Sequence, residues 1–302
     1  MRTVFLGTSE FAAAVLEKLV ASDHAPALVL SRPDARRGRG QRTAPPPVAE
    51  TARELGLPLE QPAEVNDERT RQLIAGALPD AVIVCAYGAL IKEPLLSEQP
   101  MLNVHPSLLP RWRGAAPIER AIMAGDERTG VSIMRLEAGL DSGPVCLTAG
   151  EQIQPRDTYG TLAERLQRLG GELLVCALEQ SPQFVEQSED AISYAEKISA
   201  PDRLLDPGRP AIELDRVVRA LHPHIGARVA LPGGDLLGVR GAVALDGAAE
   251  HPPEQLGLAV LDARLVLICA TGTLELLEVT PPGSRPMDAG AYLHGHADRL
   301  VR

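Results

Sequence analysis

The sequence predicts an α/β protein in which an N-terminal domain with a parallel β-sheet is followed by a smaller antiparallel β-barrel. Strand and helix patterns alternate from the N-terminus, and residues 80–86 form a continuous apolar run that is typical of a central parallel strand. From Ala227 onward, short β-rich runs are split by Gly and Pro, as in small barrels. The expected boundaries are 1–189 for the N-terminal domain, 190–207 for a linker and 208–302 for the C-terminal domain.

Residues 3–30 predict a βαβ unit. Residues 3–6 resemble a buried strand, and residues 10–21 have the periodicity of an amphipathic helix with Ser9 as its N-cap. Residues 27–30 predict a second strand, which is expected to lie parallel to the first after a right-handed crossover. The turn at Gly7 lacks the GxGxxG pattern, and no acidic residue ends the second strand. The sequence therefore disfavours a dinucleotide site.

Later segments extend the same alternation. Helical patterns occupy residues 47–55, 115–125, 158–179 and 212–221. Strand patterns occupy residues 101–105, 130–137 and 145–148. Residues 181–210 contain few aliphatic side chains and several Pro, Ser and Asp residues, which is the basis for the predicted linker.

Composition excludes several classes of protein. No apolar run approaches the length of a membrane span and the N-terminal apolar run is too short for a signal peptide, so we expect a cytoplasmic protein. The formal net charge of -10 argues against nucleic-acid binding over the whole surface, but it is compatible with a local basic patch. The cysteines are widely separated in apolar surroundings, which predicts buried free thiols rather than a metal site or disulfides. They are Cys85, Cys146, Cys176 and Cys269.

A strongly cationic segment lies between the second strand and the helix at residues 47–55. Four of its arginines are interleaved with glycine, namely Arg36, Arg37, Arg39 and Arg42. One interpretation is a solvated surface loop. The other is a contact with a phosphate backbone, because guanidinium groups pair with phosphate oxygens and glycine lets the loop adapt. The concentration of arginine in an otherwise acidic chain favours the phosphate contact.

Two polar residues mark the end of the strand that begins at Met101. Asn103 and His105 lie two residues apart, so they share one face of the strand, and a Pro- and Gly-rich run follows directly. Open α/β sheets hold their functional groups at the carboxyl ends of such strands. Tyr87 and Gly88 follow the central strand at the same edge. Tyr87 is therefore either a pocket wall or an ordinary core aromatic.

Asp141 lies in a glycine-bounded loop after the next strand, a setting that is common for a simple turn residue. Together, however, Asn103, His105 and Asp141 suit attack by an external nucleophile on a carbonyl. An Asn amide can donate to a developing oxyanion, a His can exchange a proton near neutral pH, and an Asp can orient that His. The sequence has no Ser or Cys nucleophile motif and no metal-ligand spacing.

Several motifs closely resemble those of the folate-dependent formyltransferase family. They are NVHPSLLPRWRGAAPI at residues 103–118, GVSIM at 130–134, GLDSG at 139–143, AYG at 86–88, YAEKI at 194–198, the FLGT start and the Arg- and Gly-rich segment with its PPP exit. The resemblance covers nearly the whole chain. The Asn-x-His motif with its downstream Asp is shared across the family, whereas the RWRGAAPI run and the Arg-rich segment resemble the branch that acts on tRNA.

The resemblance implies a Rossmann-like formyltransferase catalytic domain with an OB-like, tRNA-binding C-terminal domain. It implies transfer of the formyl group of 10-formyltetrahydrofolate to the α-amino group of initiator methionyl-tRNA, in translation initiation, by a monomeric, metal-free and membrane-independent enzyme. Asn103, His105 and Asp141 would be catalytic. The four arginines would contact the tRNA. The folate pocket would be lined by Ser107, Leu108, Leu109 and Pro110, with Tyr87 and Gly88.

One departure concerns the acceptor. Residues 208–302 contain no lysine, and their nine arginines face eleven carboxylates, although a tRNA-binding domain is expected to be basic. Affinity for tRNA would then depend more on the Arg-rich segment. Two alternatives remain: a formyltransferase acting on an amino-sugar nucleotide, which would share the three catalytic residues, and an inactive RNA-binding relative, against which the intact trio argues.

Overall fold

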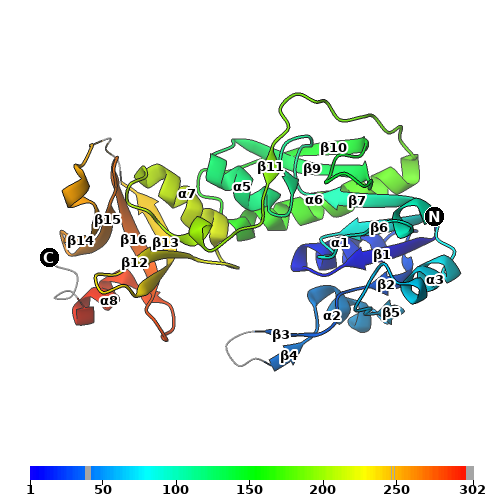
Figure 1. Ribbon diagram of the computed structural model, residues 1–302, viewed down its shortest axis with the longest axis horizontal. Helices are drawn as coiled ribbons and strands as arrows, with labels where there is room; N and C mark the ends of the chain where they lie inside the picture. Colours follow the sequence, from blue (N-terminus) through cyan, green and yellow to red (C-terminus); the bar gives the residue numbers. More distant parts are fainter. Residues whose placement is uncertain (38–41, 246, 248, 297–302) are drawn as a thin grey trace. The chain divides into compact units, whose positions relative to one another are not determined.

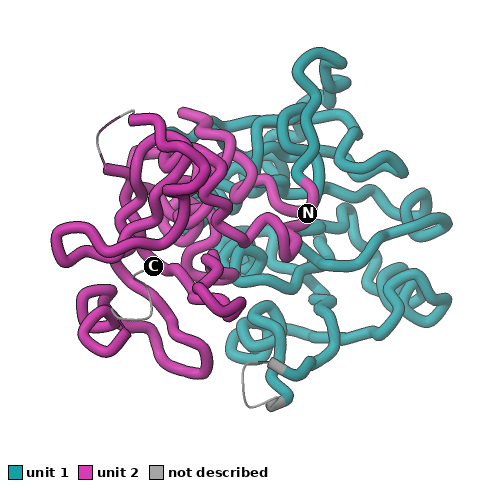
Figure 2. Tube along the Cα trace, turned by 60° about the vertical axis from the view of Figure 1, so that its left-hand side comes forward, with its two compact units in different colours: residues 1–114, 128–152, 163–195 teal, residues 115–127, 153–162, 196–302 magenta. Residues whose placement is uncertain are grey.

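The computed structural model describes residues 1–37, 42–245, 247 and 249–296. The chain divides into two compact units (Figure 2). Unit 1 comprises residues 1–114, 128–152 and 163–195, and unit 2 comprises residues 115–127, 153–162 and 196–302. The α/β and antiparallel halves of the predicted fold are both confirmed. The exact boundaries at residues 189 and 207 stay a prediction.

Unit 1 is built on a seven-stranded sheet (Figure 1). In spatial order its strands are β10 (Val145–Gln152), β9 (Arg128–Arg135), β7 (Met101–His105), β6 (Ala81–Cys85), β1 (Thr3–Gly7), β2 (Pro26–Leu30) and β5 (Leu59–Glu60). The strands from β7 to β5 are parallel, and β9 and β10 extend the sheet in antiparallel fashion. Because β7 has a hydrogen-bonded strand on each side, residues at its carboxyl end lie inside the sheet rather than at its edge.

The helices of unit 1 are α1 (Glu10–Val20), α2 (Pro47–Glu54), α3 (Glu68–Gly76), the short α4 (Leu95–Glu98) and the part of α6 (Tyr159–Gln180) from residue 163 onward. Three of them, α1, α2 and α6, lie where the sequence predicts them, whereas α3 and α4 were not predicted. Ser9 is the N-cap of α1, as predicted, and its hydroxyl accepts the Ala12 N–H at 3.3 Å. The predicted βαβ start is confirmed by the parallel pairing of β1 with β2.

Two short sheets in unit 1 were not predicted. In the Arg-rich segment, β3 (Ala35–Arg37) pairs antiparallel with β4 (Arg42–Ala44), so the described flanks of the expected loop are strands. A second sheet joins β8 (Arg113–Gly114) to β11 (Tyr194–Ala195) in parallel. The two strands are about eighty residues apart in the chain and only two residues long, so no local periodicity could reveal their pairing.

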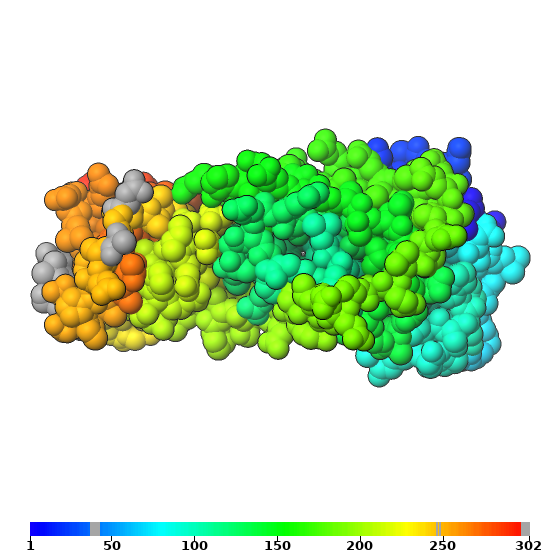
Figure 3. Space-filling view, turned by 90° about the horizontal axis from the view of Figure 1, so that it is seen from above, coloured from blue at the N-terminus to red at the C-terminus, as the bar shows by residue number. Residues whose placement is uncertain are grey.

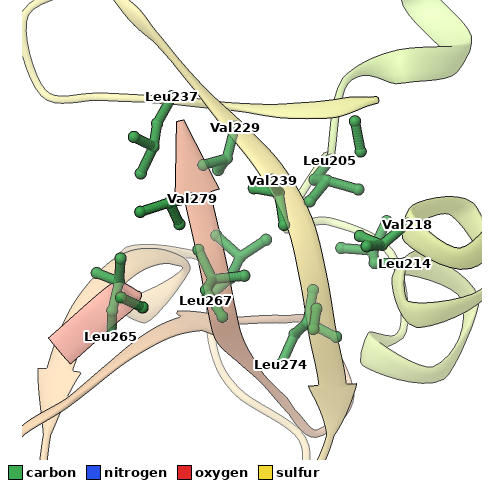
Figure 4. Close-up of a cluster of buried hydrophobic side chains, with 14 of the residues drawn as sticks. Leu205, Leu214, Val218, Val229, Leu237, Val239, Leu265, Leu267, Leu274 and Val279 are labelled. Carbon is green, nitrogen blue, oxygen red and sulfur yellow. The ribbon is translucent and has the colours of Figure 1, made fainter. Parts of the chain in front are cut away.

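Unit 2 contains an antiparallel half-barrel, consistent with the OB-like expectation. Its strand order is β12 (Ala227–Ala230), β13 (Leu236–Ala244), β16 (Thr273–Thr280), β15 (Arg264–Ile268) and β14 (Gly257–Leu261), with β17 (Met287–Asp288) pairing β16. The helices α5 (Pro117–Ala124), α7 (Ala211–Leu221) and α8 (Ala289–His296) belong to the same unit. Figure 4 shows its apolar core, in which Leu214 and Val218 of α7 face Val239, Leu267 and Leu274 of the sheet. Burial of these side chains holds α7 on the half-barrel.

The cysteines are free thiols, as predicted, but their burial differs. Cys85 and Cys269 are buried, and burial raises the pKa of both thiols, that of Cys269 to about 11. Cys146 and Cys176 are only half-buried. In the described part of the chain, no helix is long and apolar enough to span a membrane.

Candidate active site

The carboxyl end of β7 carries two buried polar side chains. Asn103 is 8% exposed and His105 is 4% exposed. Both alternate with apolar neighbours on the strand, and β6 and β9 flank them through main-chain pairing. Polar groups that are this deeply buried require hydrogen-bond partners. Those partners come from the segments that follow β7 and β9.

Asp141 lies in the loop between β9 and β10 and completes the predicted trio. Its Oδ2 accepts the backbone N–H of Gly114 at 2.8 Å, and its Oδ1 is 3.4 Å from Asn103 Nδ2, which donates to it. His105 Nδ1 is 3.7 Å from Asp141 Oδ2. The structure thus brings together the three side chains that the sequence singled out, and Asp141 stands between the other two.

The hydrogen bond of His105 identifies which ring nitrogen carries a proton. Nε2 is 2.9 Å from the carbonyl oxygen of Trp112. A carbonyl oxygen only accepts, so Nε2 must be protonated and donate to it. In the neutral ring, Nδ1 is then left with a free lone pair on the side of Asp141. Nδ1 is therefore the ring nitrogen that faces the Asp141 carboxylate.

The residues expected to line a folate pocket have different surroundings. Ser107 is fully buried and its hydroxyl donates to the Arg111 carbonyl at 2.6 Å, so it shapes the turn after β7. Leu109 and Pro110 border a shallow hollow of about 310 Å³ together with the start of β10. Leu108 is half-buried.

Tyr87 and Gly88 follow β6. Tyr87 is 2% exposed and packs in the core of unit 1 with Leu6, Leu30 and Ile91, which supports the interpretation as a core aromatic. Burial raises the pKa of its phenol. Its carbonyl accepts the Thr8 hydroxyl at 2.6 Å, which ties the end of β6 to the end of β1. Gly88 is exposed with φ +79°, and the space around its Cα is open.

The four arginines of the predicted tRNA contact are only partly described. Arg36 is exposed on β3. Arg37 and Arg42 lie at the ends of β3 and β4, and Arg39 lies outside the described residues.

Among the described residues, no group of three or more His, Cys, Asp or Glu side chains could hold a metal ion.

Several groups that support the trio were missed by sequence reasoning. The Gly114 N–H and the Trp112 carbonyl are backbone groups, which no residue type reveals. Gln187 and Ser193 lie in the segment interpreted as linker-like, yet Gln187 binds the Asp141 loop and Ser193 Oγ accepts the Trp112 N–H at 2.9 Å. Their partners are more than forty residues away in sequence, so only the fold reveals these roles.

Comparison with known proteins identifies the family. Residues 1–178 match the family model described as formyl transferase, and residues 197–297 match the model described as formyl transferase, C-terminal domain. The chain belongs to the formyl transferase family. It is 41% identical to a Methylococcus capsulatus protein, over 98% of this chain and 97% of that protein. It is 40% identical to a Paracoccus denitrificans protein, over 99% of this chain and 100% of that protein. Both relatives are named methionyl-tRNA formyltransferase.

Solved structures share the fold at low identity. HypX from Aquifex aeolicus in complex with tetrahydrofolic acid matches with a TM-score of 0.63 and 16% identity, over 97% of this chain and 47% of that one. An N-formyltransferase from Helicobacter canadensis, solved with folinic acid and dTDP-3-aminofucose, matches with a TM-score of 0.67 and 12% identity, over 91% of this chain and 98% of that one. These likenesses extend the fold assignment across both units.

Proposed function

We propose that this chain transfers the formyl group of 10-formyltetrahydrofolate to the α-amino group of methionyl-tRNA, the acceptor used in translation initiation. The observation that carries the proposal is the full-length match, at 40–41% identity, to relatives named for this reaction. The convergence of Asn103, His105 and Asp141 in unit 1 supplies the chemistry that such a transfer needs. The half-barrel of unit 2 is the proposed support for the tRNA.

The reaction replaces one C–N bond with another. The acceptor amine forms a bond to the formyl carbon, the bond from that carbon to the folate nitrogen breaks, the amine loses a proton and the folate nitrogen gains one. Negative charge develops on the formyl oxygen meanwhile, and a positioned N–H donor lowers the barrier by stabilising it. Asn103 Nδ2 has two N–H groups, of which Asp141 accepts one, so the other is available for that oxygen.

His105 and Asp141 handle the proton in this proposal. His105 Nε2 is committed to the Trp112 carbonyl, so Nδ1 takes the proton and later gives it back. Asp141 Oδ2, 3.7 Å from Nδ1, stabilises the charged ring during that interval. The donor would lie beside the apolar turn of Leu108, Leu109 and Pro110, where its formyl group can reach the trio.

The proposal is tested by offering the purified protein 10-formyltetrahydrofolate with each of two acceptors, methionyl-tRNA and an amino-sugar nucleotide. We expect formyl-methionyl-tRNA to accumulate and the sugar nucleotide to remain unmodified. Formylation of the sugar nucleotide alone would support the amino-sugar alternative. Folate binding without transfer to either acceptor would contradict an enzymatic role and favour an RNA-binding relative.

Neutralising the Arg-rich segment is expected to weaken tRNA binding. Changing Arg36, Arg37, Arg39 and Arg42 together to glutamine should raise the KM for tRNA and flatten its dependence on salt. Each phosphate contact that is lost reduces the log–log salt slope by about 0.7 to 0.9. Steady-state kinetics between low and moderate salt measure both effects. The single variants Arg36→Gln and Arg69→Gln provide a matched comparison, since Arg69 is an exposed arginine on α3. An unchanged slope in the fourfold variant would show that the segment is only solvated surface.

A further inference from the structure

Gln187 has an amide group whose two ends are both engaged near the active site. Its Nε2 donates to the carbonyl oxygen of Asp141 at 2.8 Å and to that of Gly143 at 2.7 Å. Its Oε1 accepts two N–H groups of Arg113, from Nε at 3.0 Å and Nη2 at 2.8 Å. Carbonyl oxygens only accept and guanidinium groups only donate, so the orientation of the amide is unambiguous.

The two carbonyls that Gln187 binds belong to the loop that carries Asp141. Asp141 has φ +44°, in the left-handed region that non-glycine residues rarely adopt. A backbone in that region persists only when its surroundings hold it. The amide of Gln187 holds the loop on both sides of Ser142, through the residue before it and the residue after it. The direction of the Asp141 carboxylate is thereby coupled to Gln187.

Arg113 connects the other end of the amide to the same carboxylate. Arg113 is only 8% exposed and precedes Gly114 on β8, whose N–H donates to Asp141 Oδ2. Gln187 therefore ties the main chain of the Asp141 loop to the strand that holds the Asp141 side chain. This link adds to the hydrogen bond that the Asp141 carboxylate itself makes with Gly114.

The segment that carries Gln187 is itself anchored in unit 1. Figure 1 shows it returning from the end of α6 past β10 and β9 to β11, and in Figure 3 the yellow-green atoms of this part of the chain lie on the surface. Val185 pairs with Val145 at the start of β10, and Ser193 binds the backbone of Trp112 and Arg113. Gln187 is thus held between two fixed points rather than in a free linker.

We propose that Gln187 is a positioning residue for formyl transfer, which orients Asp141 toward His105 and Asn103 by holding the backbone of residues 141–143. The inference rests on the proposed function of the site, because it assigns no new reaction. The hydrogen bonds of Gln187 go to backbone carbonyls and to Arg113 rather than to the side chains of the trio, and Gln187 also borders the hollow beside Leu109 and Pro110. Its contribution belongs in the rate of the chemical step rather than in the affinity for either substrate.

The variant Gln187→Glu tests this directly. A glutamate keeps the acceptor for Arg113 but replaces the donating nitrogen with an oxygen, which repels the carbonyls of Asp141 and Gly143. We expect kcat to fall about tenfold to a hundredfold, the range for a catalytic group that is displaced by a fraction of an ångström to one ångström, with both KM values changed by less than about threefold. Gln183→Glu is the matched control, since Gln183 is exposed in the same segment, and it should behave as the parent protein.

A second arm separates positioning from general loss of structure. In an Asp141→Ala background, Gln187→Glu should cause little further loss of kcat, because the group it orients is gone. Hydrogen exchange of the peptide spanning residues 138–144 should be faster in Gln187→Glu than in the parent or Gln183→Glu, a readout that needs no acceptor. If Gln187→Glu does not fold, Gln187→Met, of similar size and without a donor, takes its place.

The inference would be overturned by an active parent protein whose Gln187→Glu variant keeps its kcat, or by equal losses of kcat with and without Asp141. Unchanged exchange of residues 138–144 would also overturn it. A parent protein that formylates neither acceptor would instead count against the proposed function, and the exchange measurement would still decide whether Gln187 holds the loop.

Discussion

The variant His105→Ala is expected to lower kcat by about a hundredfold or more, which is the usual scale for a general acid–base residue. Alanine removes Nδ1, the ring atom that lies 3.7 Å from Asp141 Oδ2, so in the proposed mechanism the proton that leaves the acceptor amine loses its relay to the folate nitrogen. The KM for methionyl-tRNA should change little, because His105 is 4% exposed and contributes almost no binding surface. Steady-state formylation at saturating concentrations of both substrates measures the loss.

Two further variants sharpen this prediction. His105→Gln can still donate to the Trp112 carbonyl but has no titratable nitrogen in the position of Nδ1, so we expect it to be as slow as alanine. His294→Ala, on the exposed face of α8, should keep parental turnover. Near-parental kcat in His105→Gln would show that the bond to Trp112 matters more than proton transfer, and near-parental kcat in His105→Ala would remove His105 from the mechanism.

The sequence predicts those parts of unit 1 that depend on local pattern. The apolar run at residues 80–86 became β6, Ser9 capped α1, and Asn103 and His105 occupied one face of β7. Each of these predictions relied on residues that are close together in the sequence, within a single helix or strand. The sequence around Asp141, taken alone, was only weak evidence for a catalytic role, because aspartates bounded by glycines are common in turns. Its place beside the other two required the pairing of β7 with β9.

The supporting contacts could not be predicted, because they join distant segments through groups without a sequence signature. Gln187 binds a loop 46 residues earlier in the chain, and its signal is a polar residue in a polar stretch. β8 and β11 have two residues each, too few for any periodicity. Tyr87 was ambiguous for a different reason, because an aromatic residue at a strand end can line a pocket or pack in the core. Its 2% exposure in the structure favours the core.

The assignment of α5 to unit 2 likewise depends on contacts between segments that are far apart in the sequence. Sequence order places this helix between β8 and β9 of unit 1, but its polar partners come from residues far along the chain. Arg120 binds Asp202 at 2.8 Å, and Glu119 is 3.0 Å from His224 Nε2. The Arg120 guanidinium holds the pKa of Asp202 well below its usual range. These contacts join α5 to residues about eighty and one hundred positions later in the chain, which places the helix in unit 2. Sequence periodicity does not encode contacts of this kind.

The variant Asp141→Asn should also lower kcat by a factor on the order of one hundred to ten thousand, the range in which acid–base groups act. Both oxygens of Asp141 accept hydrogen bonds, Oδ1 from Asn103 and Oδ2 from Gly114. An asparagine has one acceptor and one donor, so one of these N–H groups would face another donor. It also removes the negative charge that stabilises a protonated His105 ring. The change in shape is minimal, and the loss is therefore chemical rather than steric.

Three comparisons separate these contributions. Asp141→Glu restores the charge but moves it by one methylene, so its kcat should lie between those of Asp141→Asn and the parent. Asp190→Asn, at an exposed position, should have no effect on turnover. If Asp141→Asn kept parental kcat while His105→Ala did not, the carboxylate would be a structural partner of Gly114 and the charged ring would need another counter-ion. Because Gln187 acts through Asp141 in our proposal, that result would also remove the reason for Gln187→Glu to slow the reaction.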